Sequence, residues 1–476
     1  MVGGTEDVAA SPVKWCAVSL DEVVSRGKRL EASVFDVEAR NARVIVCSSR
    51  YGYLPLMGTL QSPVARAYYG GRGKRNYVSA ARLDTIGFIG SSEMLDCRPV
   101  PVKFMPDNSK VDDLRVKYGD ILMSRSGTIG NLSFANYTLS KLLVSEHAIR
   151  IECRSNPGYV YAFLKSRVGQ LLVKSGIYGA VILEVEPEHL KSIPIPDAPE
   201  ELKRKINDLV VKSYDLRDES NALIDKATAM LVEELKLLPP IEKLAPPTNA
   251  FSVKLDDWAG RLDASYHVPI VGAIVGHLKR HASEVTTVAD PRVSKNVILP
   301  GRFKRVYVEE GYGRIFIGGK QIYELDPSNK KYLSLVHHKD RIGGQLELHE
   351  NMTLVTCSGT IGRVTLVGRH WENWTANQHI IRIVPANDGM AGFLNIWLST
   401  GYAHHLIVRH TYGSVIDEID DAQVRSIPVP LLKNKAVQDE INALALQANE
   451  KRYEAYNLEQ KALSIMDREV LTVLRD

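Results

Sequence analysis

The sequence predicts a mixed α/β (α+β) fold made of two similar tandem domains and two long coiled-coil helices. Three observations predict it: an ordered internal repeat, a heptad pattern that follows each copy of the repeat, and short Val- and Ile-rich runs between turn residues. The copies are offset by 228–234 residues, close to half of the 476-residue chain. Because solenoid repeats are only about 20–50 residues long, each copy is expected to be a whole domain.

Seven short motifs recur in the same order in both halves. They are RLEAS and RLDAS (29–33 and 261–265), GRGKRNYV and GRFKRVYV (71–78 and 301–308), FIG (88–90 and 316–318), SGTIG (126–130 and 358–362), HAIRI and HIIRI (147–151 and 379–383), YGAVI and YGSVI (178–182 and 412–416), and SIPIP and SIPVP (192–196 and 426–430). We therefore expect a first domain at 1–199, a spacer helix at 200–238, a Pro-rich linker at 239–249, a second domain at 250–432 and a C-terminal helix at 433–476.

Both spacer helices combine a row of large residues with a row of small ones at heptad spacing. The small residues are Ser213, Ser220 and Ala227 in the first helix and Ala448, Ala455 and Ala462 in the second. Small side chains let two backbones approach closely, so the two helices are expected to pack on each other; the alternative is that each packs only on its own domain. A helix of about 38 residues would be roughly 57 Å long, which suits a spacer.

A second apolar row on these helices predicts an interface with helices of a partner protein. Its residues are Val210, Ile224, Leu231, Leu238, Met466 and Val473. Alternatively, this row packs on the domains of the chain itself.

Within the domains, Val and Ile at 44–47 indicate a strand. Residues 121–123 and 131–134 form a predicted hairpin around the first SGTIG turn, and 353–357 and 363–367 form its counterpart. Residues 159–174 and 392–409 are predicted to be helical from the spacing of their Leu, Phe and Tyr residues.

Composition and missing motifs narrow the class of protein. The apolar and charged content is that of a globular protein, which excludes disorder and collagen. The five scattered cysteines contain no CxxC pair, which argues against a zinc ribbon and fits a reducing compartment. No secretory signal or run of 18 apolar residues is visible, so a cytoplasmic protein without a membrane association is expected. No GxxxxGK[ST], HExxH, GxSxG or [ND]PP[FY] motif is present, so neither catalysis nor a bound metal is expected.

The positive charge belongs to the domains. The chain carries +4, and because the two helical segments carry −2 and −1, the remainder carries +7. Such charge favours nucleic-acid phosphate. The repeated GRxKRxYV segment supplies the best DNA-binding candidates, which are Arg72, Lys74, Arg75 and Tyr77 in the first copy and Arg302, Lys304, Arg305 and Tyr307 in the second. The alternative is a solvated basic strand edge.

The two SGTIG hairpin tips add further candidates for a DNA groove. They are Ser124, Arg125 and Thr128 in the first half and Thr360 and Arg363 in the second, with Lys320 just after the second FIG copy. Equally, the repeated glycines could serve only the geometry of the turn. His147 and His379 are more consistent with structural histidines than with base or phosphate contacts.

Taken together, the ordered duplicate of RL[ED]AS, SGTIG and SIP[IV]P, each copy followed by a long helix, resembles the specificity subunit of Type I restriction–modification systems. The resemblance spans nearly the whole chain. One departure is that the segments 197–201 and 431–435 lack the PPLEEQ-like run that often follows the SIP[IV]P exit in this family.

The resemblance implies two target-recognition domains related by pseudo-twofold symmetry and separated by two antiparallel helices. Each domain would read one half of a split, asymmetric target in double-stranded DNA. Two methyltransferase subunits carrying S-adenosylmethionine would modify adenine, and restriction subunits using ATP and Mg would join them. The specificity chain would be non-catalytic and would bind no cofactor itself. Two other interpretations stay open: a coiled-coil scaffold that does not bind DNA, and the recognition half of a split or fused adenine methyltransferase–nuclease.

Overall fold

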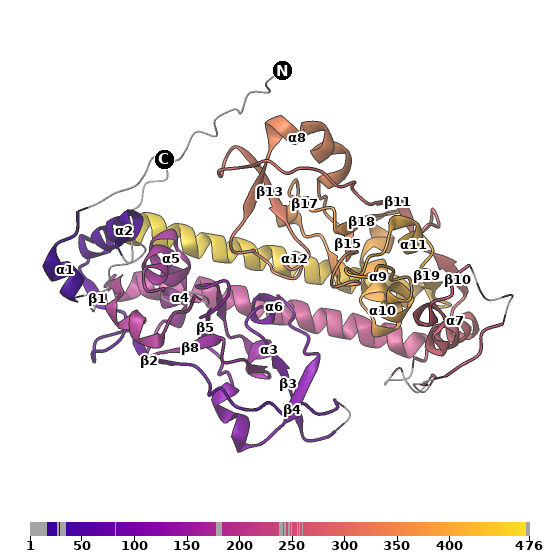
Figure 1. Cartoon of the computed structure of the whole chain (residues 1–476), viewed down its shortest axis with the longest axis horizontal. Coiled ribbons are helices and arrows are strands. Elements are labelled where there is room, and N and C mark those ends of the chain that lie inside the picture. The colour runs from indigo at the N-terminus through magenta and orange to yellow at the C-terminus, as the bar shows by residue number, and fades with distance from the viewer. Residues whose placement is uncertain are drawn as a thin grey trace. The chain divides into compact units, whose positions relative to one another are not determined.

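The computed structural model describes residues 17–25, 28, 35–80, 82–177, 183–237, 241, 244–245, 248, 250–254, 256, 258 and 260–472 (Figure 1). The chain forms two compact units. Unit 1 comprises residues 1–95, 99–214 and 458–476, and unit 2 comprises residues 96–98 and 215–457. The motif copies at 29–33 and 178–182 and most of the predicted linker lie outside the described residues.

Unit 1 contains short strands and helices in the first part of the chain. They are α1 (Leu20–Ser25), α2 (Val37–Cys47), β1 (Tyr53–Pro55), β2 (Val64–Tyr68), β3 (Thr85–Ile89), β4 (Lys103–Pro106), β5 (Ile121–Ser124), β6 (Leu132–Phe134), α3 (Tyr137–Ser140), β7 (Leu143–Val144), β8 (Ala148–Cys153), α4 (Pro157–Lys165), α5 (Arg167–Lys174) and β9 (Pro194–Pro196).

Unit 2 repeats this plan with additions. Its elements are α7 (Pro269–His281), β10 (Glu284–Thr287), β11 (Ser294–Ile298), β12 (Tyr307–Val308), β13 (Gly313–Ile317), β14 (Lys331–Ser334), α8 (Leu335–Arg341), β15 (Thr353–Thr356), β16 (Val364–Leu366), β17 (Thr375–Ala376), β18 (Ile380–Pro385), α9 (Asp388–Leu398), α10 (Gly401–Val408), α11 (Asp421–Arg425) and β19 (Pro428–Leu431).

The sheet topology confirms the duplication. The order β2-β8-β5-β6 in unit 1 matches β11-β18-β15-β16 in unit 2, and β4-β3-β7 matches β14-β13-β17. The second sheet, which in unit 2 also contains β12, keeps its one parallel pairing in both units, β3 with β7 and β13 with β17. The two units are therefore copies of one mixed α/β domain, as the repeat predicts.

Both predicted hairpins are confirmed: β5 pairs with β6, and β15 pairs with β16, on either side of the two SGTIG turns. The two predicted helical segments are also helical, but each is interrupted. Ser166 ends α4 and caps α5, and Thr400 separates α9 from α10 and caps the latter.

The strand predicted at 44–47 is wrong, because these residues belong to helix α2. The Asp36 side chain caps this helix by accepting a hydrogen bond from the Ala39 N–H at 3.0 Å. Ala39, Ala42 and Val46 are buried at helical spacing. Packing of this face against the core outweighs the strand preference of Val and Ile.

Two long helices take part in both units. Helix α6 (Glu200–Glu234) has 35 residues and α12 (Lys435–Ile465) has 31; they are the long pink and yellow helices of Figure 1. At about 1.5 Å per residue, α6 is roughly 52 Å long. The compact units cut across the predicted spacer segments, because residues 200–214 of α6 belong to unit 1 and residues 215–234 to unit 2.

Within unit 2 the two helices pack on each other in antiparallel directions. Lys226 pairs with Glu440 at 3.2 Å, whereas the earlier Ser220 accepts a hydrogen bond from the later Arg452 at 3.3 Å. The small residues Ser220, Ala227, Ala448 and Ala455 of this region have no exposed surface. The expected close approach of the helices is confirmed here.

The core of unit 1 is completed by the end of the chain. Ile206 and Val210 of α6 are buried in one cluster with Ile465, Met466, Val470 and Leu471. Beside it, Glu459 of α12 has no exposed surface and contacts both Lys165 Nζ and the hydroxyl of Tyr161 at 2.6 Å. A buried carboxylate of this kind needs such partners to compensate for lost hydration.

The fold accounts for the repeated Ile-Arg-Ile segment. Arg150 of β8 and Arg382 of β18 have no exposed surface, and their guanidinium groups donate to backbone carbonyls. Arg150 bonds Leu114 O at 2.8 Å and Arg382 bonds Leu346 O at 3.1 Å. Each arginine also donates to a carbonyl of the second sheet, at Val144 of β7 in unit 1 and Ala376 of β17 in unit 2. Within each unit, these arginines therefore join the sheet that contains β8 or β18 to the sheet that contains β7 or β17.

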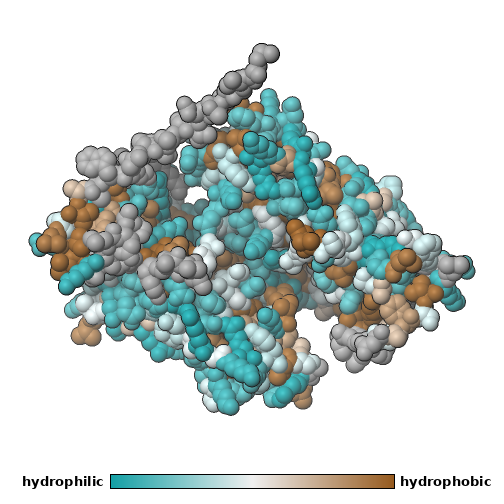
Figure 2. Space-filling view, viewed as in Figure 1, coloured by the Kyte–Doolittle hydropathy of each residue, from teal (hydrophilic) through white to brown (hydrophobic). Residues whose placement is uncertain are grey.

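Hydrophilic residues cover most of the face drawn in Figure 2. Among the described residues, no helix combines the length and the apolar character that a membrane crossing requires.

Candidate nucleic-acid interface

The GRxKRxYV segment of unit 1 is a loop that follows β2 and presents its cations beside an aromatic pair. Arg72 pairs with Glu184 at 2.9 Å, and Lys74 is exposed. Arg75 pairs with Glu146, and its guanidinium lies over the Phe88 ring at 4.9 Å from the centroid. The loop therefore mixes neutralised and exposed cations.

Tyr77 joins this arrangement at the end of the loop. Its ring is tilted on that of Phe88, with centroids 5.9 Å apart, and Lys103 Nζ lies 5.1 Å from the Tyr77 centroid. Tyr77 stays 43 % exposed, and Lys103 is exposed as well. We call Arg75, Tyr77, Phe88 and Lys103 the first stack. Cations over aromatic faces are held in place by the ring quadrupole, so the two rings position the side chains of Arg75 and Lys103.

Unit 2 contains the same arrangement, which we call the second stack: Arg305, Tyr307, Phe316 and Lys331. The rings of Tyr307 and Phe316 are 6.0 Å apart, Lys331 lies 5.3 Å from the Tyr307 centroid, and Arg305 lies 5.6 Å from that of Phe316. Tyr307 is 42 % exposed. Arg302 pairs with Glu418 at 3.0 Å, as Arg72 does with Glu184, and Lys304 is exposed.

Sequence reasoning missed the lysine and phenylalanine of each stack. Lys103 lies directly opposite Phe88 in the β3–β4 ladder, and Lys331 lies opposite Phe316 in the β13–β14 ladder. Lys103 and Lys331 share the offset of 228 with the two phenylalanines. That common offset was the signal that could have found them.

The two stacks differ at one contact. In unit 1 Arg75 meets the carboxylate of Glu146, whereas in unit 2 Arg305 donates to the neutral amide oxygen of Gln378 at 2.9 Å. Burial, followed by the nearby Arg305 charge, lowers the pKa of His379. The positive charge of Arg305 thus disfavours protonation of the neighbouring His379.

At the first hairpin tip, Ser124 and Arg125 of the predicted DNA-binding set are buried. Ser124 is 3 % exposed, and its hydroxyl closes the turn by donating to Thr128 O and accepting from the Asn131 N–H at 3.0 Å. Arg125 is 1 % exposed; it pairs with Glu184 and Glu186 and lies over the Tyr69 ring. Both side chains are thus engaged by groups of unit 1 itself.

The other hairpin candidates are placed differently. Thr128, Thr360 and Lys320 are exposed. Arg363 is 23 % exposed, pairs with Asp96 of the same unit at 3.4 Å and lies over the Tyr323 ring at 4.1 Å. Arg363 is therefore held by contacts within unit 2.

Turn geometry accounts for the repeated glycines. Gly127 and Gly359 have φ of 73° and 75°, and Gly130 and Gly362 have φ of 86° and 80°, values that disfavour any other residue. Beside the first turn, His147 Nδ1 is 2.7 Å from the Ser126 hydroxyl. The SGTIG repeat is therefore explained by the fold before any ligand is considered.

The described residues of the predicted partner-helix row lie in or against the cores of the two units. Val210, Leu231 and Met466 have no exposed surface, because they pack in the cores of their own units, and Ile224 packs against the core of unit 2. Leu238 and Val473 lie outside the described residues. The alternative, that this row serves the chain's own domains, fits the described residues.

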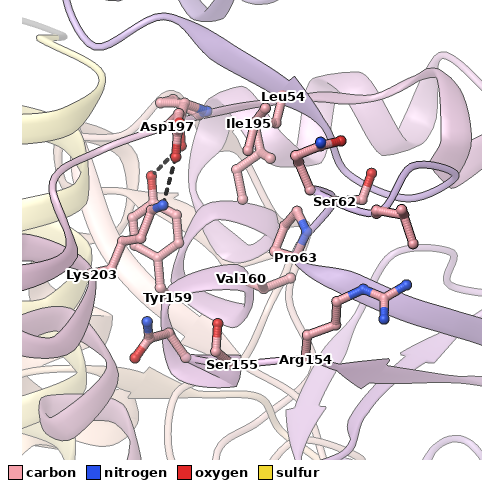
Figure 3. Close-up of a pocket in the computed structure, with 14 residues that line it drawn as sticks. Leu54, Ser62, Pro63, Arg154, Ser155, Tyr159, Val160, Ile195, Asp197 and Lys203 are labelled. Carbon is pink, nitrogen blue, oxygen red and sulfur yellow. Dashed lines mark hydrogen bonds and ion pairs between the residues drawn. The ribbon is translucent and has the colours of Figure 1, made fainter.

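A cavity of about 240 Å³ opens in unit 1 and shares no lining residue with the first stack (Figure 3). Leu54, Val160 and Ile195 form its apolar wall. Lys203 is bound to Asp197 at 2.6 Å, and the Tyr159 hydroxyl donates to Pro196 O at 2.7 Å. These two bonds lie within the lining of the cavity. Among the described residues, no cluster of His, Cys, Asp and Glu has the arrangement of a metal site.

Comparisons with known proteins give matches among solved structures. No protein-family model and no curated protein matches the chain. The S subunit of a Type I restriction–modification system from M. genitalium is 11 % identical, with 87 % of this chain and 94 % of that chain covered and a TM-score of 0.33. The HsdS subunit from Thermoanaerobacter tengcongensis is 12 % identical, with 82 % and 91 % covered and a TM-score of 0.28.

A third match comes from a structure described as showing complex assembly and conformational transition of the type I R-M system. It is 14 % identical over 80 % of this chain and 90 % of that chain, with a TM-score of 0.25. The structural neighbours named here include S subunits of Type I restriction–modification systems, the family that the repeated motifs resemble.

Proposed function

We propose that this chain is the sequence-specific DNA-binding subunit of a Type I restriction–modification complex and is not itself catalytic. The observation that carries the proposal is the stack of Arg, Tyr, Phe and Lys that recurs in both units, with both tyrosines about 40 % exposed. Lysine and arginine anchor phosphate, and tyrosine can donate to it. The exposed Lys74 and Lys304 extend each basic surface.

The target would be bipartite and asymmetric. Each unit reads one half-site, and the sequences between the shared motifs differ, so the two half-sites differ as well. Helices α6 and α12, which take part in both units, would fix the length of unread DNA between the half-sites. In the cytoplasm, two methyltransferase subunits carrying S-adenosylmethionine would modify adenine in the target, and restriction subunits using ATP and Mg would join them.

A binding experiment with the full chain tests the DNA contact. The probe is a 40-base-pair duplex of mixed sequence, titrated at several salt concentrations. We expect K103A and K331A each to weaken binding and to reduce the salt slope by about 0.9 for each phosphate that the variant no longer binds. The matched control is K141A, because Lys141 lies over the Tyr137 ring at 3.9 Å in unit 1, outside the stack. Equal binding by all four proteins would contradict the proposal.

Methylome sequencing tests the biological role. Cells that lose this chain should lose adenine methylation at one bipartite motif, while other motifs are unchanged. Replacement of unit 1 residues such as Tyr77 should affect one half of the motif, and replacement of Tyr307 the other. An unchanged methylome in cells without the chain would exclude the role in methylation and leave a DNA-binding or scaffold protein.

A further inference from the structure

The two basic loops face groups of different charge at matched positions. In unit 1 the Glu146 carboxylate pairs with Arg75, while in unit 2 the neutral Gln378 amide takes the same place beside Arg305. These residues correspond by sequence as well, because each directly precedes the repeated histidine. Glu146 is 8 % exposed and the Arg75 side chain 30 %, so the pair is shielded from much of the solvent.

A second difference lies at the start of the loops, where unit 1 again has the more negative group. The Gly71 N–H donates to the Asp113 carboxylate at 2.6 Å, whereas the matching Gly301 carbonyl accepts from Arg341 at 2.9 Å. Unit 1 therefore has an acid at this place and unit 2 a base. The remaining ion pair of each loop is the same in both units, Arg72 with Glu184 and Arg302 with Glu418.

The following inference rests on the proposed function. We propose that Glu146 and Gln378 give the two DNA-reading units different amounts of positive charge for phosphate, so that unit 2 supplies the stronger phosphate contact. An arginine already neutralised by a carboxylate releases few counterions when phosphate approaches, because the carboxylate competes for the same guanidinium. An arginine bound to an amide keeps its full charge for phosphate. Binding by unit 2 should therefore be tighter and more salt-dependent, whereas unit 1 depends more on contacts with bases and on shape.

Glu146 and Gln378 can be exchanged without a change in the local packing. Each unit already shows that its side chain fits beside an arginine, and Glu and Gln have nearly the same shape. E146Q is expected to free Arg75 and strengthen binding, and Q378E is expected to neutralise Arg305 and weaken it. The double variant E146Q/Q378E should restore binding close to that of the wild type, with the strong contact moved to unit 1.

The measurement uses the full chain and the same 40-base-pair mixed-sequence duplex between 50 and 200 mM salt. Binding of one phosphate more or one fewer changes the salt-induced loss of affinity over this range about 3.5-fold, from a slope of about 0.9 per bound phosphate. We expect E146Q to steepen this loss by that factor and Q378E to reduce it similarly. In addition, K331A should weaken wild-type binding more than K103A, and this order should reverse in the double variant. Circular dichroism of each variant checks folding, and the two swaps test the inference independently.

The outcomes separate this inference from the proposed function. Salt slopes that stay unchanged in E146Q and Q378E, while K103A and K331A still weaken binding equally, overturn the inequality and leave the DNA-binding role intact. Absence of DNA binding by the wild-type chain overturns the proposed function instead.

Discussion

The hydrogen bonds between α9 and α12 allow a quantitative test of how α12 stabilises unit 2. Asn442 of α12 is 7 % exposed, and its Oδ1 accepts from the N–H groups of Gly392 and Phe393 at 2.8 and 3.2 Å. Its Nδ2 donates to Asp388 O at 2.9 Å. A Cβ on Gly392 would lie 2.5 Å from Asn442 O, so the glycine allows the close approach that these bonds need.

Replacement of Asn442 by alanine removes all three hydrogen bonds. At about 1 kcal/mol each, the loss of free energy of unfolding is about 3 kcal/mol. Asn207 provides an internal scale, because its Oδ1 accepts one bond from Gly158 N–H at 2.9 Å in unit 1. Its second bond, from Nδ2 to the Asp208 carboxylate at 3.1 Å, is exposed to water and contributes little, so N207A should cost only about 1 kcal/mol.

Urea unfolding followed by tryptophan fluorescence measures this effect, because Trp371, Trp374 and Trp397 are buried in unit 2. The control is N457A, the same substitution at an exposed position of the same helix, which should change the free energy of unfolding very little. The reasoning fails if N442A unfolds within about 0.5 kcal/mol of the wild type, or if N207A, followed by circular dichroism, costs more than N442A.

Two further predictions concern buried titratable groups. His370 is stacked on Tyr456 with centroids 4.8 Å apart, and burial lowers its pKa to about 4. Because the unfolded pKa of histidine is about 6.5, the contribution of His370 to the free energy of unfolding should be fully present above pH 6.5. It should fall by up to about 3 kcal/mol as the pH drops toward 4. H370Q should remove this part of the pH dependence of urea unfolding. E459A should cost about 3–5 kcal/mol, because it leaves Lys165 partly buried without its carboxylate, whereas E454A at an exposed position of α12 should be nearly neutral in the same unfolding assay.

The duplication could be predicted from the sequence because the order and spacing of short motifs record it. The hairpins could be predicted from neighbouring residues alone, because strand residues flank a turn whose glycines need positive φ. The segment 44–47 was mispredicted because its Val and Ile residues indicate a strand, while the burial that selects a helix depends on distant parts of the chain.

The candidate site was predicted less completely than the fold, since ion pairs and cross-strand contacts join residues far apart in sequence. Arg125 is an example, because Glu184 and Glu186 bury it from about 60 residues away. Lys103 is the opposite case: nothing in its immediate sequence marks it, yet the β3–β4 register places it opposite Phe88. The basic loops themselves could be found because both copies keep them.

The composition of the unit 1 core has a consequence for synthesis on the ribosome. Ile465, Met466, Val470 and Leu471, which complete that core, are made only after the whole of unit 2. At about 5–20 residues per second, the roughly 270 residues between β9 and Ile465 take on the order of 13–54 seconds. During this interval Ile206 and Val210 lack these four partners, and the unit 2 core, drawn from residues 227–445, is made in full before Ile465. The half translated first is thus the half that finishes folding last, and it is the one exposed to aggregation when elongation stalls.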